Sequence, residues 1–381
     1  MRVLIVSPTF LPHAGGCAKS TKYLYEGIAD TYDSELLIVS KNKYLERENI
    51  SYLRLEPKSI VNFLRIVMSI RKIVKNRNID IVHVYNVFMI PHVNLATLGM
   101  KCRVFGTLNN LNWGCVNPNY YSKHRCTSCD FIKRRKCTSF AKSVQFSLGT
   151  SLLSYADRLF CFSQVFKNIY SMQGVPKNKL IKIQNFKSDD ENKGRIIKSV
   201  SNNSKIKFIF IGNIDERKGI HILYDAFSYI KSKHCGFSNK VELVVLGGGE
   251  QSYIKRFNEL HDVTCKLIEP DSKEFYNEIS CSDVLIHPAI CNEAFARVWI
   301  EASMHGLALI SSDTDSAKEL LSNHAVYYNK FSSDSLVESI ECLVDNRDYL
   351  IKLKESSRVW FDNLLSNQEV IDSIIKEYRK C

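Results

Sequence analysis

The sequence lacks an apolar run long enough to span a bilayer, which argues against a transmembrane helix. It also lacks the marks of a secretory signal. The opening residues, MRVLIVSPTF, hold only a short apolar core and no small-residue cleavage site, so we expect a first strand there. A disulfide framework is not indicated, because the thirteen cysteines are odd in number and no signal precedes them. We therefore expect a protein of the reducing cytoplasm.

Acidic residues are fewer than basic ones, 40 against 52, which gives a formal net charge of +12. Such an excess suits an anionic membrane surface, phosphorylated substrates or nucleic acid, and does not choose among them. The basic residues are scattered, and aromatic residues are not interleaved with them in a stacking pattern, so no nucleic acid is expected. The 381 residues are enough for two domains.

Residues 282–313 form the most informative stretch of the chain. The pattern predicts a strand over 284–286, an irregular loop, a helix that begins near Ala296 and a second strand over 307–310. Glu293 lies before this helix and Glu301 one turn into it. A helix start offers free backbone N–H groups that favour a phosphate, and carboxylates can bind sugar hydroxyls. The combination suits a sugar nucleotide.

Glycine-containing turns follow three of the predicted strands. The opening strand leads into HAGGCAKS, with Gly15 and Gly16, although the spacing is not that of a G-x-G-x-x-G fingerprint. The strand KIKFIFIGN leads into a turn that carries Arg217 and Lys218. The strand VELVVLGGGE ends in three glycines around Gly248. Ligands of α/β proteins bind at such strand ends, but an ordinary or solvated turn is the alternative at each position.

The segment HP…NEAFARVWIEASMHG…ISSD resembles the donor-binding segment of the family 4 retaining glycosyltransferases. This resemblance implies the α/β fold called GT-B, with two Rossmann-like domains facing across a cleft. It places Glu293 and Glu301 at the family's E-x7-E motif, with Glu293 at the transferred sugar and Glu301 at the ribose. Two family glycines are replaced here by Ala294 and Ala296, so the fit to the sugar is expected to differ.

The same resemblance extends to other residues of the donor site. GNIDERKGIHILYDAF resembles a family motif in which Lys218 grips the donor diphosphate; the family's arginine is Asn213 here, and Arg217 is the candidate to compensate. No metal is then needed for catalysis. The complete set of expected donor-binding residues is Gly15, Gly16, Asn213, Arg217, Lys218, Gly248, Phe295, Ala296, Arg297 and Glu301.

A departure from the family affects the catalytic prediction. The family's T-x-H-D-x-x-W motif is TLNNLNW here, so Asn109 stands in place of a histidine near the transferred sugar. An asparagine can orient a sugar hydroxyl but cannot act as a general base. We therefore list Asn109 beside Glu293 as a catalytic candidate with an orienting role. His83 is the nearest substitute by pattern, although a histidine at a strand end is more often structural.

The segment after this motif is rich in cysteine. Cys115, Cys126, Cys129 and Cys137 follow the spacing C-x10-C-x2-C-x7-C, which suits a tetrahedral zinc ion with four protein ligands. Such a site has no open position, so the zinc would be structural. Basic residues around the cluster would offset its negative charge. The alternative is a set of free thiols.

The domain organisation follows from these elements. We expect an acceptor-side domain over 1–186 with a cysteine-rich loop at 109–140, a polar linker over 187–205, a nucleotide-sugar domain over 206–358, and a helix over 359–381 that returns to the first domain. A helix near residues 59–78 carries an apolar stripe, expected to pack on the core, and a basic face. The face is either solvated or rests on anionic lipid headgroups. The stripe consists of Ile60, Phe63, Leu64, Val67, Ile70 and Val74.

By resemblance, the expected activity is transfer of a hexose from a nucleotide-sugar to an acceptor hydroxyl with retained anomeric configuration. We expect a saccharide or lipid-linked acceptor and a place in bacterial O-antigen or capsule assembly, on the inner face of the plasma membrane. Two alternatives remain: a nucleotide-sugar epimerase of the same fold, and a basic zinc-containing protein that binds nucleic acid.

Overall fold

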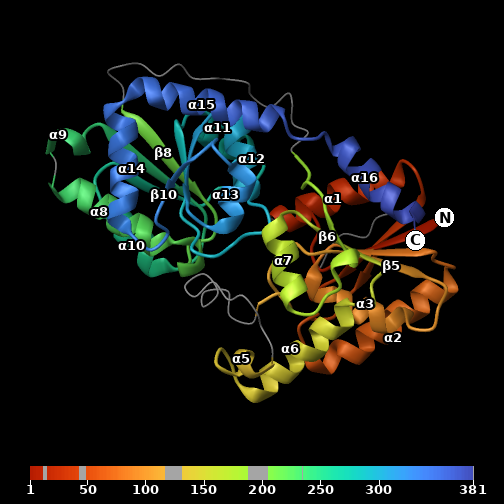
Figure 1. The fold of residues 1–381 in the computed structure, drawn as a ribbon. Helices are drawn as coiled ribbons and strands as arrows, with labels where there is room; N and C mark the ends of the chain where they lie inside the picture. Colours follow the sequence, from red (N-terminus) through yellow and green to blue (C-terminus); the bar gives the residue numbers. More distant parts are fainter. Residues whose placement is uncertain (12–14, 43–48, 116–130, 188–204, 234, 381) are drawn as a thin grey trace. The chain divides into compact units, whose positions relative to one another are not determined.

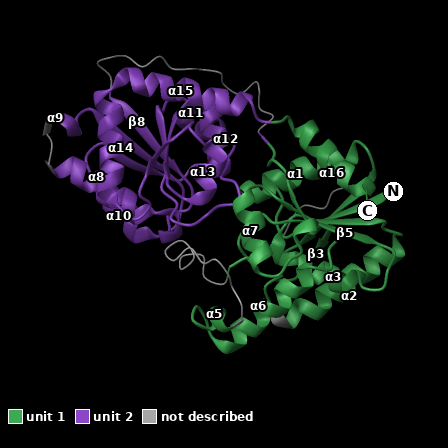
Figure 2. Cartoon of the chain, viewed as in Figure 1, with its two compact units in different colours: residues 1–186, 365–381 green, residues 187–364 purple. Residues whose placement is uncertain are grey.

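The computed structural model describes residues 1–11, 15–42, 49–115, 131–187, 205–233 and 235–380. These residues form two compact units (Figure 2). Unit 1 comprises Met1–Phe186 together with Leu365–Cys381, and unit 2 comprises Lys187–Leu364. Each unit is a parallel β-sheet with helices on its faces, so the α/β fold class expected from the sequence is confirmed. No helix in the described part of the chain is long and apolar enough to cross a membrane.

The sheet of unit 1 is parallel throughout and has the strand order β3-β2-β1-β4-β5-β6-β7. Most of its strands are buried over nearly their whole length, as expected for a sheet covered on both faces. The strands are β1 (Arg2–Ser7), β2 (Asp33–Val39), β3 (Ile50–Leu53), β4 (Ile81–Val84), β5 (Arg103–Thr107), β6 (Arg158–Cys161) and β7 (Leu180–Lys182).

The helices of unit 1 connect these strands and cover the sheet (Figure 1). They are α1 (Gly16–Ala29), α2 (Ile60–Asn76), the short η1 (Val87–Met89), α3 (Ile90–Thr97), α5 (Phe131–Arg135), α6 (Phe140–Leu153), α7 (Gln164–Met172), the short η2 (Lys177–Lys179) and the C-terminal α16 (Asn367–Lys380). The cysteines at 126 and 129 of the predicted zinc set lie outside the described residues.

The C-terminal helix α16 packs on unit 1 beside α1 (Figure 1). Gly27 of α1 allows this approach, because a Cβ there would lie 2.5 Å from a side-chain carbon of Ile371. The hydroxyl of Tyr378 forms a hydrogen bond of 2.6 Å with His83 Nδ1. The other ring nitrogen of His83 lies 2.9 Å from Thr107 Oγ1. Burial lowers the pKa of His83 to about 3. His83 is therefore a neutral, structural histidine.

The point at which the chain returns to unit 1 differs from the sequence expectation of residue 359. Residues through Leu364 belong to unit 2, because α15 (Arg347–Asp362) continues across that boundary. Trp360 is 7% exposed, lies in the core of unit 2, and donates its indole N–H to the carbonyl of Leu320 at 2.8 Å. Phe361 and Leu364 pack in the same core, so residues 359–364 belong to unit 2.

The sheet of unit 2 is also parallel and has the order β10-β9-β8-β11-β12-β13. Alternate residues of its central strand face two separate apolar cores, Phe208 and Phe210 on one side and Ile209 and Ile211 on the other. Both faces are therefore covered by helices. The strands are β8 (Ile206–Ile211), β9 (Val241–Leu246), β10 (Val263–Lys266), β11 (Val284–His287), β12 (Ala308–Ser312) and β13 (Val326–Tyr328).

Two helices, α8 and α14, cover one face of this sheet, and α11, α12 and α13 contribute to the core on the other face. The helices of unit 2 are the short η3 (Glu216–Lys218), α8 (Ile220–Lys233), α9 (Cys235–Ser238), α10 (Gln251–Asn258), α11 (Lys273–Ser280), α12 (Arg297–Met304), α13 (Asp315–Leu321), α14 (Ser333–Asp345) and α15.

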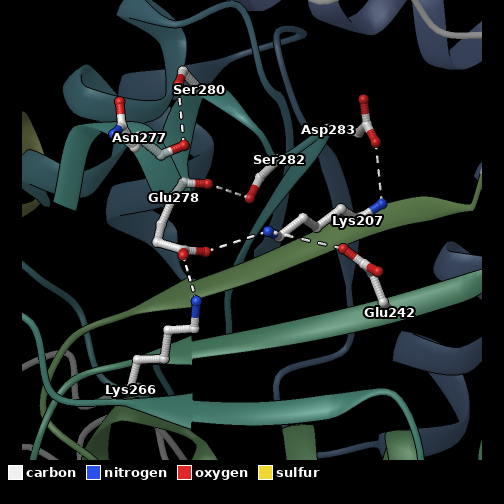
Figure 3. Close-up of polar contacts among 8 residues, drawn as sticks. All are labelled: Lys207, Glu242, Lys266, Asn277, Glu278, Ser280, Ser282 and Asp283. Atoms are coloured by element: carbon white, nitrogen blue, oxygen red, sulfur yellow. Dashed lines mark hydrogen bonds and ion pairs between the residues drawn. The ribbon is translucent and has the colours of Figure 1, made fainter. Parts of the chain in front are cut away.

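Buried charges fix the two central strands of unit 2 against each other. Asp283, the residue before β11, accepts a hydrogen bond from the backbone N–H of Lys207 in β8 at 3.0 Å (Figure 3). Its other oxygen lies 3.1 Å from the ammonium of Lys354 of α15, and both of these side chains are less than a tenth exposed. Glu278 of α11 binds the ammonium groups of Lys207 and Lys266 (Figure 3). The Asp283 contact holds β11 against β8, and the Glu278 contacts tie α11 to β8 and β10.

We predict that Lys354→Met lowers the free energy of unfolding by about 3–5 kcal/mol, because it leaves the carboxylate of Asp283 buried without its counter-charge. Urea unfolding of the full chain measures this. Lys352→Met on the exposed side of the same helix is the control, and we expect a change within about 0.5 kcal/mol there. Equal effects of the two substitutions would show that the buried pair contributes nothing specific.

Candidate functional site

The strand order of unit 2 identifies where a ligand would bind. The connections from β8 and β11 leave the sheet toward opposite sides, because β8 is followed by β9 on one side and β11 by β12 on the other. Loops that diverge in this way leave a crevice at the carboxyl ends of the two strands. The β8 loop leads into η3 with Lys218, and the β11 loop carries Glu293 and leads into α12.

The η3 turn presses directly on the β11 loop. Asp215 caps the turn, because its carboxylate accepts a hydrogen bond from the backbone N–H of Lys218 at 3.0 Å. Gly219 ends the turn with a left-handed φ of 70°, and a Cβ there would lie 1.8 Å from the carbonyl oxygen of Pro288. Ile290 donates its backbone N–H to the carbonyl of Arg217 at 3.1 Å. Tight backbone packing therefore places Lys218 beside the β11 loop.

Lys218 and Glu293 form an ion pair across these two loops. Lys218 Nζ lies 2.5 Å from Glu293 Oε1, and both side chains keep some exposure to solvent, 30% and 23%. His287 Nε2 lies 3.6 Å from the same oxygen. Burial alone would raise the pKa of Glu293, but the charges of Lys218 and His287 lower it and hold it below its usual range. Glu293 is thus a carboxylate at neutral pH.

Helix α12 begins directly after this loop, with Ala296 as its N-cap, as the sequence predicted. No side chain caps this helix start, so its first backbone N–H groups remain available to a ligand. Arg297 and Glu301 lie on the helix and are 7% and 5% exposed. Asn292 anchors the loop, because its side-chain oxygen accepts hydrogen bonds from the backbone N–H and hydroxyl of Ser316.

Aromatic rings line the same loop and helix. Trp299 of α12 meets His287 edge to face, with ring centroids 5.0 Å apart. Phe295 lies 6.0 Å from Trp299 and stacks on Trp360 at 6.2 Å. Phe295 is half-buried and Trp299 is fully buried. The loop that carries Glu293 is therefore fixed by packing on one side.

The glycine turn after β9 lies against the β8 loop. Gly247 has a φ of 148°, and a Cβ there would lie 1.9 Å from the carbonyl oxygen of Gly212. Gly248 accepts a hydrogen bond from the backbone N–H of Ile214 at 2.9 Å. Asn213, between these contacts, is exposed. The predicted donor residues Asn213 and Gly248 thus share one edge of the sheet with η3.

Arg217 lies next to Lys218 but does not take part in its ion pair. The guanidinium of Arg217 contacts Asp215 at 3.3 Å, and its side chain is 70% exposed. A compensating role for the missing family arginine would require this side chain to leave Asp215. The structure therefore separates the two neighbouring basic residues, one turned toward Glu293 and one toward solvent.

The remaining predicted site residues belong to unit 1. Gly15, with a φ of 127°, is the N-cap of α1, and a Cβ there would meet no described atom within 4 Å. Asn109, after β5, donates its amide to Cys17 Sγ at 3.3 Å and accepts from the backbone N–H of Val87 at 3.4 Å. The glycine turn, including Gly16, and Asn109 therefore meet through Cys17, whose pKa burial raises.

Two of the four predicted zinc ligands are described. Cys115 and Cys137 are both half-buried, and Cys137 Sγ lies 3.9 Å from the carbonyl oxygen of Lys133. The partners Cys126 and Cys129 lie outside the described residues. Within the residues that the structure covers, no group of three or more His, Cys, Asp or Glu side chains is placed to hold a metal ion. The zinc site stays a prediction.

Sequence reasoning missed the residues that assemble the site rather than bind a ligand. Asp215, Gly219 and Asn292 have no chemistry of their own that a motif would reveal. In the sequence, His287 is only the first residue of a His-Pro pair, and its distance to Glu293 depends on the loop between them. Cys17 was hidden in the glycine turn. Only the lysine–glycine order at Lys218 and Gly219 gave a local signal.

Comparison with known proteins shows what this chain is similar to. Residues 193–360 match the family model described as "Glycosyl transferases group 1". The gpi3 subunit of phosphatidylinositol N-acetylglucosaminyltransferase from Schizosaccharomyces pombe is 21% identical, over 98% of this chain and 81% of that protein. The O-antigen chain mannosyltransferase C of Escherichia coli is 23% identical over 45% of this chain and 46% of that protein.

Solved structures agree at the level of the fold. The Anabaena protein Alr3699/HepE, crystallised in complex with UDP, superposes with a TM-score of 0.73 at 14% identity, and both chains are covered completely. The same protein in complex with UDP-glucose gives a TM-score of 0.71 at 13% identity. The family match, the curated relatives and the two parallel-sheet units identify the chain as a glycosyltransferase with the GT-B fold.

Proposed function

We propose that the protein transfers a hexose from a nucleotide-sugar donor to an acceptor hydroxyl, with retention of the anomeric configuration. The observation that carries the proposal is the meeting of Lys218, Glu293 and the uncapped start of α12 at one edge of the sheet of unit 2. An ammonium group and free amides suit a diphosphate, and a carboxylate suits sugar hydroxyls. The UDP and UDP-glucose complexes of HepE support a nucleotide-sugar as the donor.

The chemical roles follow from where charge develops. As the glycosidic bond to the diphosphate breaks, the leaving oxygen gains negative charge, and Lys218 with the N–H groups of α12 stabilises it. Glu293 binds hydroxyls of the sugar, and Glu301 binds the ribose. The buried Arg297 and the half-buried Phe295 close the site beside Ala296, and Gly248 lets the nucleotide approach the backbone. These residues do the work of a divalent ion, so catalysis proceeds without one.

In this reaction, the residues of unit 1 orient the sugar. Gly15 and Gly16 expose the start of α1, and Asn109 beside them holds an amide that can bind a sugar hydroxyl. Asn109 has no group that titrates near neutral pH, so it does not remove the acceptor proton. The leaving diphosphate takes this proton in the proposed reaction. The hydrogen bonds of Asn109 to Cys17 and Val87 fix its side chain.

We also propose that the cysteine-rich segment holds a structural zinc ion through Cys115, Cys126, Cys129 and Cys137. The C-x2-C pair, with a further cysteine on each side, supports this ligand set. Such a zinc would order the segment that follows Asn109. The chemistry of sugar transfer does not pass through it.

The acceptor in this proposal is a saccharide carried by a lipid, assembled into a bacterial surface polysaccharide. The match to an O-antigen mannosyltransferase supports the polysaccharide, and the surface of α2 supports the lipid. Leu64, expected from the sequence to face the core, is 63% exposed, together with Val61 and Met68 at 75% and 62%. Helical spacing puts these three side chains on one face, with Arg65 and Lys72 at its margin. An apolar stripe with a basic margin suits an anionic membrane surface.

Donor binding tests the function. The donor is first identified by screening a panel of nucleotide-sugars for hydrolysis. We then predict that Lys218→Met weakens binding of that donor by about 10- to 100-fold, since a hydrogen bond between charged groups contributes about 1.5–3 kcal/mol. Calorimetric titration measures the affinity.

Lys255→Met is the matched control, because it removes the same charge from an exposed position on α10. We expect its affinity for the donor to equal that of the parent within about twofold, because salt screens the effect of an exposed charge on binding. If Lys218→Met binds as tightly as this control, the donor diphosphate does not contact Lys218 and the site is misassigned.

Flotation with lipid vesicles tests the membrane proposal. We predict that the protein floats with anionic vesicles more than with neutral ones. Leu64→Ser with Met68→Ser should reduce this binding by about tenfold, since each substitution removes an exposed apolar side chain that the membrane would bury. Leu267→Ser, at a position 84% exposed in unit 2, is the control. Equal binding by the double variant and the control would contradict a docking role for α2.

A further inference from the structure

His287 is buried without a hydrogen-bond partner. It is the last residue of β11, is 4% exposed, and neither of its ring nitrogens makes a hydrogen bond with any described residue. A polar ring of this kind costs free energy when it is buried unpaired, so its presence requires an explanation. The contrast is His83, also in a buried strand, whose two ring nitrogens both have hydrogen-bond partners.

The ring of His287 faces a carboxylate that already has a counter-ion. Nε2 lies 3.6 Å from Glu293 Oε1, and the ammonium of Lys218 lies 2.5 Å from that same oxygen. Trp299 holds the imidazole from the side at 5.0 Å. His287 is thus the second and more distant partner of the carboxylate that Lys218 occupies.

Donor binding must change this arrangement if Lys218 binds the diphosphate. The ammonium then turns toward the phosphate oxygens and away from Glu293. The carboxylate would be left in a half-buried position without its hydrogen-bonded partner, which is costly. Imidazole is the side chain that most readily gains a charge near neutral pH, and His287 is the imidazole within reach.

We propose that His287 is a positioning residue for the donor: on donor binding it takes up a proton, replaces Lys218 as the counter-ion of Glu293, and holds this carboxylate toward the sugar. This rests on the proposed function. For each donor molecule bound, one proton moves from solvent to His287. No covalent bond changes. Because the bound state holds the additional proton, affinity for the donor falls as pH rises.

The charges around His287 support this direction. Glu293 on its own loop favours the imidazolium, and Lys218 of η3 opposes it while the site is empty. Arg217 of η3 contacts Asp215, and α12 carries two buried side chains of opposite charge, Arg297 and Glu301. A diphosphate that draws Lys218 away removes the opposing charge and adds negative charge nearby. Both changes favour protonation of His287.

Calorimetric titration of the intact protein with the nucleotide-sugar that it hydrolyses tests the proposal. The probe has no group of its own that titrates near pH 7. At that pH, in buffers of different ionisation enthalpy, we expect a fractional proton uptake per donor bound, and an increase in Kd of about three- to tenfold between pH 6 and 8, below the limit of tenfold per pH unit for one proton.

His287→Gln keeps an amide donor in place of the ring, and we expect it to bind the donor with no proton uptake and a flat pH dependence. Glu293→Gln removes the charge that attracts the proton, and we expect it to abolish uptake as well, which covers the case that His287→Gln does not fold. Thermal unfolding of each variant establishes that it is folded.

The outcomes separate the two proposals. Donor binding by the parent protein without proton uptake, or the same uptake in His287→Gln as in the parent, would overturn the role of His287 and leave the donor site intact. Failure of the parent protein to bind any nucleotide-sugar would instead overturn the proposed function. Uptake that disappears in both variants supports the exchange of counter-ions.

Discussion

The ion pair between Lys218 and Glu293 is the contact on which the account of unit 2 depends. It joins the two loops that leave the sheet at its switch point, through residues 75 positions apart in sequence. Backbone packing brings the loops together, because Gly219 lies against the carbonyl of Pro288 with no room for a side chain. At the other end of β11, Asp283 fixes β11 to β8. The charged pair is therefore held from both ends of the strands.

The two histidines buried in strands, His83 and His287, differ in their hydrogen bonding and therefore in their roles. His83 binds Tyr378 and Thr107, so it joins the C-terminal helix to the sheet of unit 1 and has no capacity left for a ligand. His287 is nearly as buried, at 4% exposed against 0%, but has no hydrogen bond among the described residues, and it faces a carboxylate. The same residue type in a buried strand thus serves packing in unit 1 and lies beside a carboxylate in unit 2.

Much of the fold was predictable, since parallel strands buried on both faces and glycine turns before helices leave strong local patterns. The start of α12 at Ala296, with Glu293 before it, followed from helical spacing. Periodicity did not predict that Leu64 is exposed, because it gives the face of a helix but not what covers that face. The return to unit 1 at residue 365 follows the packing of Trp360, Phe361 and Leu364 in the core of unit 2, which is tertiary contact.

The candidate site was also predictable only in part. The residue types at Lys218, Glu293 and Glu301 were recognisable, because their chemistry and spacing match a known motif. Their assembly was not, because the 2.5 Å contact of Lys218 with Glu293 and the 3.6 Å approach of His287 arise from loop packing. Arg217, which has the same charge as Lys218 and is next to it, turned out to contact Asp215 at the surface. The sequence indicated the types of side chain at the site, and tertiary packing determines which of them lie together.

The central claim is that the donor diphosphate occupies the edge of the unit 2 sheet between η3 and the start of α12. Hydrogen–deuterium exchange with and without the hydrolysed nucleotide-sugar tests this most directly. The account predicts slower amide exchange in peptides covering 212–219 and 288–300, with no change in α10. Saturation with a donor that the protein hydrolyses, with exchange unchanged in both segments, would contradict it.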